Sequence, residues 1–331
     1  MRKAKIITVL LIGALLLTGC RENGGTSSEV ETLSSVGSES SAGAGDSGIS
    51  EENSPYSFTD SAGRSVEVSE LGKTVVLSSS LAEIWQLSGG ELFGATADVF
   101  DAKNITLSQN TVNCGDLKTP SAETIIASGA DFVILSSTIT GHTKLEATLT
   151  ATGITAAYFD IEDFEDYLGM LKICTDINDR PDLYEKNGES IRARVEAAVA
   201  KAQGQASPKI LLMRAYSTGI KAKGSDNMTG QMLKDLGCVN IADSDVSLLE
   251  ELSLEAIIRA DPDFVFITTM GEDEEAAVAT YEKTLGENPA WQSLSAVKNG
   301  EVHILPKDLY HLKPNARWGE AYEKLEEILY E

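Results

Sequence analysis

Residues 121–135 (SAETIIASGADFVIL) and residues 253–267 (SLEAIIRADPDFVFI) decide how this chain folds. The second stretch repeats the first at an offset of 132 residues, and seven of the fifteen positions are identical. Each copy reads as an N-cap serine, an acidic first turn, a helix, a tight turn and a buried strand. The repeat predicts two similarly built lobes, each with one glutamate at a helix start, Glu123 and Glu255. Chance similarity between two ordinary helix–strand units is the alternative.

Outward from this repeat, short apolar strands alternate with amphipathic helices from residue 56 onward. That alternation is typical of a mostly parallel α/β sheet. We expect an opening hairpin of residues 56–60 and 64–68. Further strands are expected at 74–77, 92–96, 131–135, 156–159, 209–213, 263–268 and 302–305, and helices at 81–88, 121–128, 145–151, 228–236, 253–260, 272–284 and 314–330.

A long helix is expected between the two sets of strands. Pro181 stands where the first turn of a helix tolerates proline, and apolar residues continue at helical spacing from there. A helix over 181–203 would be about 34 Å long at 1.5 Å per residue, enough to run along two stacked lobes. The sequence therefore predicts an α/β fold of two Rossmann-like lobes with mostly parallel sheets. The lobes are residues 56–178 and 205–331, joined by one long inter-lobe helix within 179–204.

The first twenty residues have the pattern of an export signal. Three cations among the first five residues precede an apolar run at 6–17, about 12 residues where a membrane-spanning helix needs about 20. The run ends in Leu-Thr-Gly-Cys at 17–20, which resembles the lipobox of a bacterial lipoprotein precursor. We expect a signal peptide at 1–19 and a lipid on Cys20 that holds the chain at the outer face of the cytoplasmic membrane. An anchor helix that happens to end in cysteine is the alternative.

Residues 20–55 are rich in Ser, Gly and Glu and carry almost no large apolar side chains. Such a segment cannot bury enough surface to offset the entropy of ordering, so we expect a disordered tether. Three further cysteines, Cys114, Cys174 and Cys238, show no C-x-x-C spacing. We expect them to be small buried apolar residues, with any pairing among them left open.

The chain is strongly acidic, with 27 Lys and Arg against 51 Asp and Glu and a formal net charge of -24. This balance excludes nucleic acid as a partner, because that affinity rests on cations that neutralise phosphates. It also excludes a basic surface that binds anionic lipids. Acidity of this kind keeps a protein soluble and monomeric, so we expect a monomer.

Several segments, taken in their order along the chain, carry a resemblance to a known family. They are FTDSAGR at 58–64, VVLSSSLAE at 75–83, PSAE at 120–123, LSLE at 252–255, WQSLSAVKNGEV at 291–302 and the helix after Pro314. Together with the lipobox and the inter-lobe helix, they resemble the substrate-binding lipoproteins of iron-siderophore, haem and cobalamin ABC importers, a class III periplasmic-binding-protein-like family. The resemblance covers about residues 56–331.

This resemblance implies a ligand cleft between two α/β lobes and limited closure about a rigid helix. It also implies partners, the permease and ATPase subunits of an ABC transporter. Glu123 and Glu255, one per lobe, would dock onto arginines of the membrane subunits. The alternative is that both glutamates merely favour their helix N-termini, an effect of about 0.3–1 kcal/mol.

Ligands of open α/β sheets lie beyond the carboxyl ends of the strands, which nominates candidate cleft residues. These are Ser79, Ser80, Ser137, Arg214, Tyr216, Tyr310, His311 and Arg317. Arg214 and Arg317 would suit an anionic ferric chelate, unless each pairs with a carboxylate such as Glu320. His311 beside Tyr310 could ligate haem iron, and the alternative is an ordinary pair lining the cleft.

Other functional classes fit the sequence less well. An enzyme is not expected, because the chain lacks G-x-S-x-G, H-E-x-x-H, P-loop and G-x-G-x-x-G motifs. A receptor for free zinc or manganese would need several histidines, and only His142 and His311 are plausible cleft residues. A surface lipoprotein that binds a free metal ion or a small colourless solute without transport stays open.

The sequence thus predicts an exported, lipid-anchored receptor that captures a ferric siderophore and delivers it to an ABC importer. Cobalamin and haem are the alternative ligands. We expect no cofactor and no metal bound directly by protein side chains.

Overall fold

The computed structural model describes residues 55–69 and 71–331. The expected signal peptide, the lipid-bearing Cys20 and nearly all of the expected tether lie outside these residues. The described residues belong to one compact unit. Within the described part of the chain, no helix is both long and apolar enough to cross a membrane.

The N-terminal lobe is built on a five-stranded parallel sheet whose strand order is β5-β4-β3-β8-β9. Its central strands β3 (Thr74–Val76) and β8 (Phe132–Ser136) are buried along their whole length, as expected for a parallel sheet covered on both faces. The other strands are β4 (Gly94–Ala95), β5 (Val112–Asn113) and β9 (Thr155–Phe159). The helices of this lobe are α1 (Ser79–Leu87), α2 (Ala97–Phe100), α3 (Ala122–Ser128), α4 (Thr140–Thr143) and α5 (Glu146–Ala151).

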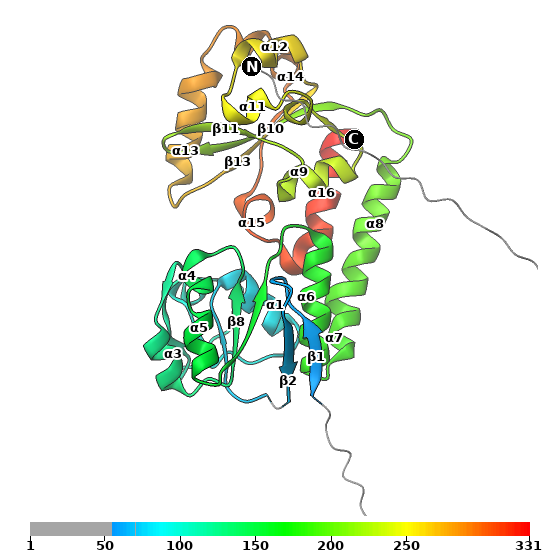
Figure 1. The fold of residues 1–331 in the computed structure, drawn as a ribbon. Coiled ribbons are helices and arrows are strands. Elements are labelled where there is room, and N and C mark those ends of the chain that lie inside the picture. The colour runs from blue at the N-terminus through cyan, green and yellow to red at the C-terminus, as the bar shows by residue number, and fades with distance from the viewer. Residues whose placement is uncertain (1–54, 70) are drawn as a thin grey trace, which may run out of the picture. The chain divides into compact units, whose positions relative to one another are not determined.

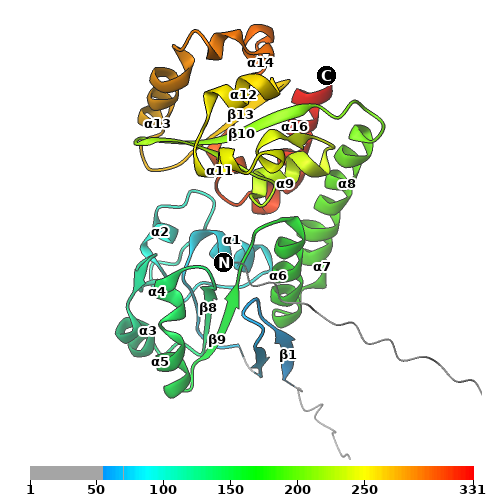
Figure 2. The same ribbon diagram turned by 45° about the horizontal axis from the view of Figure 1, so that its top comes forward.

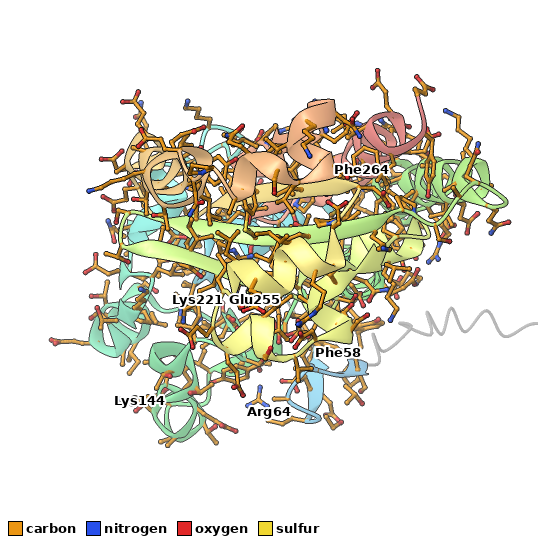
Figure 3. All side chains as sticks on the ribbon, turned by 90° about the horizontal axis from the view of Figure 1, so that it is seen from above. Phe58, Arg64, Lys144, Lys221, Glu255 and Phe264 are labelled. Atoms are coloured by element: carbon orange, nitrogen blue, oxygen red, sulfur yellow. The ribbon has the colours of Figure 1, made fainter. Side chains whose placement is uncertain are left out.

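The expected opening hairpin is present as β1 (Tyr56–Thr59) and β2 (Ser65–Val68), which pair antiparallel. Figure 3 labels Phe58 and Arg64 on this blue hairpin. A second small hairpin, β6 (Gly115–Asp116) with β7 (Thr119–Pro120), leads into α3.

The C-terminal lobe has a second five-stranded sheet of order β11-β10-β13-β14, with β12 also paired to β10. All its pairings are parallel except β10 with β11, a hairpin that the sequence analysis missed. The strands are β10 (Lys209–Tyr216), β11 (Gly219–Lys223), β12 (Val239–Asn240), β13 (Phe264–Thr269) and β14 (Val302–Ile304). The expected α/β fold with two mostly parallel sheets is therefore confirmed.

Helices surround this second sheet. They are α9 (Met228–Asp235), α10 (Ile241–Ser244), α11 (Ser247–Glu250), α12 (Leu254–Ala260), α13 (Glu274–Tyr281), α14 (Ser295–Asn299), α15 (Lys307–Tyr310) and α16 (Trp318–Tyr330). Shorter turns are the π-helical η2 (Glu282–Gly286) and the 3-10 helices η3 (Trp291–Ser293) and η4 (Asn315–Arg317).

The sequence repeat is also a structural repeat. Ser121 Oγ accepts a 3.1 Å hydrogen bond from the Thr124 N–H, and Ser253 Oγ accepts one of 3.3 Å from the Ala256 N–H. These side chains cap α3 and α12 as the sequence predicts. Both helices end at a residue in the left-handed region, Gly129 at φ 72° in one copy and Asp261 at φ 44° in the other.

The shared aspartates of the repeat have the same function in both lobes. Asp131 Oδ2 accepts a 2.8 Å hydrogen bond from the backbone N–H of Lys73, immediately before β3. Asp263 Oδ2 accepts a 2.8 Å bond from the backbone N–H of Lys209, the first residue of β10. Each aspartate thus ties the start of its own strand to the first core strand of its lobe.

A helical segment runs between the lobes. It comprises α7 (Pro181–Tyr184), a π-helical turn η1 (Glu185–Glu189) and α8 (Ser190–Ala202), and it follows α6 (Phe164–Ile177). Pro181 stands in the first turn of α7, as expected. The C-terminal helix α16 packs against α8, and Figures 1 and 2 both show the two side by side. The Trp318 ring at the start of α16 lies 5.6 Å from the Phe164 ring of α6.

The three cysteines of the described residues are free and buried, as expected for small apolar side chains. Burial raises the pKa of Cys114 to about 11 and that of Cys238 to about 12. The thiols are therefore protonated and unreactive near neutral pH.

Candidate ligand cleft

A cavity of about 1050 Å³ lies at the carboxyl ends of the strands of the N-terminal lobe and is also lined by segments of the C-terminal lobe. This volume is slightly above the usual range for small-molecule sites, about 300–1,000 Å³. The N-terminal lining is Ser78, Ser79, Ser80, Leu81, Glu83, Asp98, Asp101, Ala102, Lys103, Asn104, Leu117, Ser136, Thr138, Ile139, Phe159, Asp160 and Ile161. The C-terminal lining is Glu274, Pro306, Lys307, Asp308, His311, Leu312, Lys313, Pro314 and Arg317.

The serine loop after β3 is held by the start of α2. Ser78 Oγ caps α1 by accepting a hydrogen bond from the Leu81 N–H. Asp98 Oδ2 accepts a 2.8 Å hydrogen bond from the Ser79 N–H. The second carboxylate oxygen of Asp98, Oδ1, is buried and has no partner among the described residues. The loop is therefore fixed by one carboxylate oxygen while the other keeps its accepting capacity.

Glu83 lies on α1 at the floor of the cavity. Its Oε2 accepts a 2.6 Å hydrogen bond from Asn315 Nδ2. Burial raises the pKa of Glu83, and hydrogen bonds from the side chains of Asn315 and Asn104 partly offset that rise. Asn315 precedes α16, so this contact joins the C-terminal segment to the N-terminal lobe.

Arg317 lines the cavity, but its guanidinium already has two carboxylate partners. Its Nε donates a 2.7 Å bond to Glu320 Oε2, and its Nη1 donates to Asp308 Oδ2. Hydrogen bonds from Arg317 and Lys324 hold the pKa of Glu320 at about 2. The structure thus selects the alternative in which Arg317 pairs with neighbouring carboxylates.

His311 and Lys313 belong to the C-terminal lining of the cavity. Burial lowers the pKa of His311 to about 4, helped by the nearby charges of Arg214, Lys307 and other lysines. The ring is therefore neutral near pH 7, and its Nδ1 is buried with no partner among the described residues. Burial also lowers the pKa of the Lys313 ammonium, which makes no ion pair within 4 Å in this part of the chain.

Four of the eight expected cleft residues line the cavity: Ser79, Ser80, His311 and Arg317. Four do not. Tyr310 is 1% exposed, and its hydroxyl donates a 2.9 Å bond to the Ala321 carbonyl, so it belongs to the core. The segment after β14 forms helix α15, in which Leu309 and Tyr310 are the buried residues.

The other three residues do not line the cavity. Two belong to a strand that is longer than expected, and the third lies between two residues that line the cavity. Strand β10 continues to Tyr216 and pairs with β11, so Arg214 and Tyr216 lie within the sheet rather than in a loop beyond it. Arg214 nevertheless lies close enough for its charge to lower the pKa of His311. Ser136 and Thr138 line the cavity, whereas Ser137 between them bonds through its N–H to the Phe159 carbonyl.

Sequence reasoning missed the acidic residues of the cavity, Asp98 and Asp101 above all. They follow β4, which lies between β5 and β3 in the sheet, so the rule of carboxyl strand ends nominates them as it nominates the serine loop after β3. His142, considered above as a cleft histidine, is fully buried: its Nδ1 accepts from the Ser136 N–H at 3.0 Å, and its Nε2 lies 2.8 Å from the Leu117 carbonyl.

The two expected docking glutamates lie in the first turns of α3 and α12 and are exposed. Figure 3 labels Glu255 among the yellow helices of the C-terminal lobe. Neither Glu123 nor Glu255 makes an ion pair within the described residues. Ile126 and Ile258, which are equivalent positions of the repeat, are 37% and 36% exposed. Each glutamate therefore has an exposed isoleucine three residues along the same helix face.

Residues 55–69 and 71–331 contain no group of three or more His, Cys, Asp or Glu side chains placed to hold a metal ion.

Comparison with known proteins gives consistent matches. The Periplasmic binding protein family matches residues 74–309. The Fe(3+)-citrate-binding protein YfmC of Bacillus subtilis (strain 168) is 33% identical over 101 residues, which is 30% of each chain, so the match spans less than a third of that relative's length.

Two solved structures share the fold. An ABC transporter substrate-binding protein from Listeria monocytogenes EGD-e superposes with a TM-score of 0.63 at 18% identity, over 79% of this chain and 99% of its own. S. aureus IsdE complexed with heme superposes with a TM-score of 0.62 at 15% identity, over 79% of this chain and 100% of its own. The family match covers most of the chain and includes both sheets and the helical segment between them. The chain therefore belongs to the Periplasmic binding protein family, whose members are transport receptors rather than enzymes.

Proposed function

We propose that this chain captures a ferric siderophore or a related iron chelate and delivers it to an ABC importer. The observation that carries the proposal is the cavity of about 1050 Å³, walled by both lobes and lined by serines, carboxylates and lysines. A cavity of this size, with apolar surface and several polar groups in its lining, suits a drug-sized ligand better than a single ion or a macromolecule. The name of the Bacillus relative, an Fe(3+)-citrate-binding protein, supports an iron chelate as the class.

Haem is the second candidate ligand, and one observation favours it. His311 lines the cavity with a neutral ring, which is the protonation state that binds iron. Tyr310 does not contribute, because its hydroxyl is held in the core. Cobalamin is a further alternative, and no residue of the cavity favours it over the chelate. The same is true of a free metal ion and of a small colourless solute.

The mechanism requires capture, partial lobe closure and docking, with no covalent chemistry. We propose that Glu123 and Glu255 dock onto cationic residues of the permease subunits. Their exposure, their lack of ion pairs in the described residues and their equivalent places in the repeat support this role. The ATPase subunits would complete the transporter.

The chain organisation follows from this function. We propose a signal peptide at 1–19, lipid attachment at Cys20 and a disordered tether at 20–55 that holds a monomeric receptor at the outer face of the cytoplasmic membrane. The receptor would consist of lobes 56–178 and 205–331 with the helical segment 179–204 between them. The lipobox-like residues 17–20 support this arrangement.

A visible absorption spectrum tests the ligand class. The purified full chain in detergent is incubated in turn with ferric siderophores, cobalamin and haemin, and then desalted. A retained charge-transfer band supports the iron chelate, a Soret band supports haem and a corrinoid band supports cobalamin. His311→Ala should abolish a Soret band that depends on ligation while leaving a charge-transfer band in place. A colourless protein in every case would contradict the proposal.

A further inference from the structure

The charges of the cavity are unevenly distributed between its walls. The N-terminal wall carries four carboxylates, Glu83, Asp98, Asp101 and Asp160, against the single cation Lys103. Two of these carboxylates make no ion pair within the described residues: Asp98, in the first turn of the short helix α2, and Asp101, the residue that ends it. A ligand group that approaches this wall therefore meets a negative potential.

Most cations of the C-terminal lining already make ion pairs or hydrogen bonds within the protein. Arg317 is held by Glu320 and Asp308, so its net contribution to an incoming anion is small. Lys307 Nζ donates a 2.6 Å bond to the Gly271 carbonyl and lies 3.8 Å from Glu274 Oε1. The guanidinium and the ammonium that an anionic chelate would need are thus already engaged.

Lys313 is the cation of this wall that lacks a close partner in the described part of the chain. It is half-buried, and Asp160, Glu162 and Asp166 lie near enough for their charges to act on it. Near His311 the positive charges of Arg214, Lys223, Lys307 and Lys313 act together. This end of the cavity therefore suits acceptor oxygens, whereas the end near Asp98 and Asp101 suits donors or a cation.

We propose that the chelate taken by this cleft has a neutral, oxygen-rich iron centre and carries a cationic group, which lies toward Asp98 and Asp101. The chelate binds with its acceptor oxygens toward Lys313 and the His311 ring, which both line the cavity. Polyanionic chelates are disfavoured, since they meet four carboxylates on one wall and an engaged arginine on the other. This inference rests on the proposed function and narrows its ligand by charge.

The test compares three iron chelates of different charge on the full chain in detergent. Ferrioxamine B has a neutral trihydroxamate centre with a pendant ammonium, its N-acetyl derivative lacks that positive charge, and ferric citrate is anionic. We expect ferrioxamine B to bind about three- to thirtyfold more tightly than the acetylated chelate, as expected for one charge near two carboxylates. Raising the salt concentration should narrow this preference.

Two variants locate the effect. Asp101→Asn, at an exposed cavity residue, should reduce the preference for the ammonium-bearing chelate and leave the affinity for the acetylated one nearly unchanged. Asp179→Asn is the matched control, because Asp179 is exposed, is absent from the cavity lining and has a positive φ of 51° that asparagine tolerates. It should keep the full preference.

The outcomes separate this inference from the proposed function. Equal affinity for the charged and acetylated chelates, or tighter binding of ferric citrate, would overturn the inference that the chelate carries a cationic group. The proposed function as an iron-chelate receptor would still hold. An unchanged preference in Asp101→Asn would overturn the placement of the cationic group. If the chain binds none of the three chelates and no band is retained in the spectral panel above, the proposed function itself fails.

Discussion

Asn315 Nδ2 donates a 2.6 Å hydrogen bond to Glu83 Oε2, across 232 positions of sequence. The same amide also donates a 3.1 Å bond to the Ser80 carbonyl at the serine loop of the cavity. Asn315 is fully buried and has a φ of 50°, a left-handed conformation that asparagine tolerates better than most residues. The segment before α16 is therefore fixed to the cavity floor by one side chain in an uncommon backbone conformation.

Two substitutions of Asn315 separate the contribution of its side-chain hydrogen bonds from that of its left-handed backbone conformation. Asn315→Gly should lower the free energy of unfolding by about 1–3 kcal/mol, because Glu83 and Ser80 lose a buried donor. Asn315→Ala should cost about 1–2 kcal/mol more, because alanine is strained at positive φ. Urea denaturation of both variants measures the difference. Equal stability of the Gly and Ala variants would show that the backbone conformation carries no cost here.

The hairpin at the start of the fold depends on a buried carboxylate. The Asp60 side chain is fully buried and accepts hydrogen bonds from the backbone N–H groups of Ala62, Arg64 and Tyr158 and from the Arg64 guanidinium. Asp60→Asn should lower the free energy of unfolding by about 3–5 kcal/mol, because it leaves the arginine without its buried partner.

Glu146 provides the matched control for this pair. It is the second carboxylate of Arg64, at 3.1 Å, but its side chain is 51% exposed. Glu146→Gln should therefore cost less than about 1 kcal/mol in the same urea experiment. Similar losses in the two variants would contradict the importance given to burial of Asp60.

His311 should make stability depend on pH. Burial and the surrounding cations lower its pKa in the folded state to about 4, whereas an unfolded histidine titrates near about 6.5. The unfolded state therefore takes up a proton first, so this stabilising contribution is full above about pH 6.5 and declines as the pH falls toward about 4. The difference between wild-type and His311→Asn unfolding free energies, measured across this range, should show that decline. A pH-independent difference would contradict it.

Charge reversal at the repeat-related glutamates tests docking. Glu123→Lys and Glu255→Lys should each reduce uptake of the iron chelate by cells by about tenfold or more, while chelate affinity in solution stays at the wild-type value. Glu196→Lys, an exposed glutamate on α8, is the control and should leave uptake intact. Wild-type uptake in the double variant Glu123→Lys/Glu255→Lys would show that these residues do not dock.

The repeat made the two-lobe fold predictable from sequence. Its N-cap serines and its apolar Phe-Val pairs specify a helix and a strand locally, and the structure confirms both copies. The hairpin β10–β11 escaped prediction because Arg214 and Tyr216 interrupt an apolar strand pattern and suggest a loop. The π-helical turn at 185–189 also has no local signature in the sequence.

The cavity was only partly predictable, for a related reason. The rule of carboxyl strand ends nominated Ser79, Ser80, His311 and Arg317, and all four line the cavity. It gives no information on pairing, so the engagement of Arg317 by Asp308 and Glu320 became visible only in the structure. The orientation of Tyr310 depends on the packing of α15 against α16, which is a tertiary property.

The central claim is that the cavity between the lobes holds the iron chelate. Equilibrium dialysis of the full chain against the ferric chelates of the spectral panel tests it most directly, using a substitution that fills the cavity. Thr138 is exposed and lines the cavity, whereas Thr150 is exposed on α5 and is not part of the lining. We predict that the wild-type chain and Thr150→Trp each retain about one chelate per chain and that Thr138→Trp retains almost none. Retention of the wild-type amount by Thr138→Trp, or none by the wild-type chain, would contradict the claim.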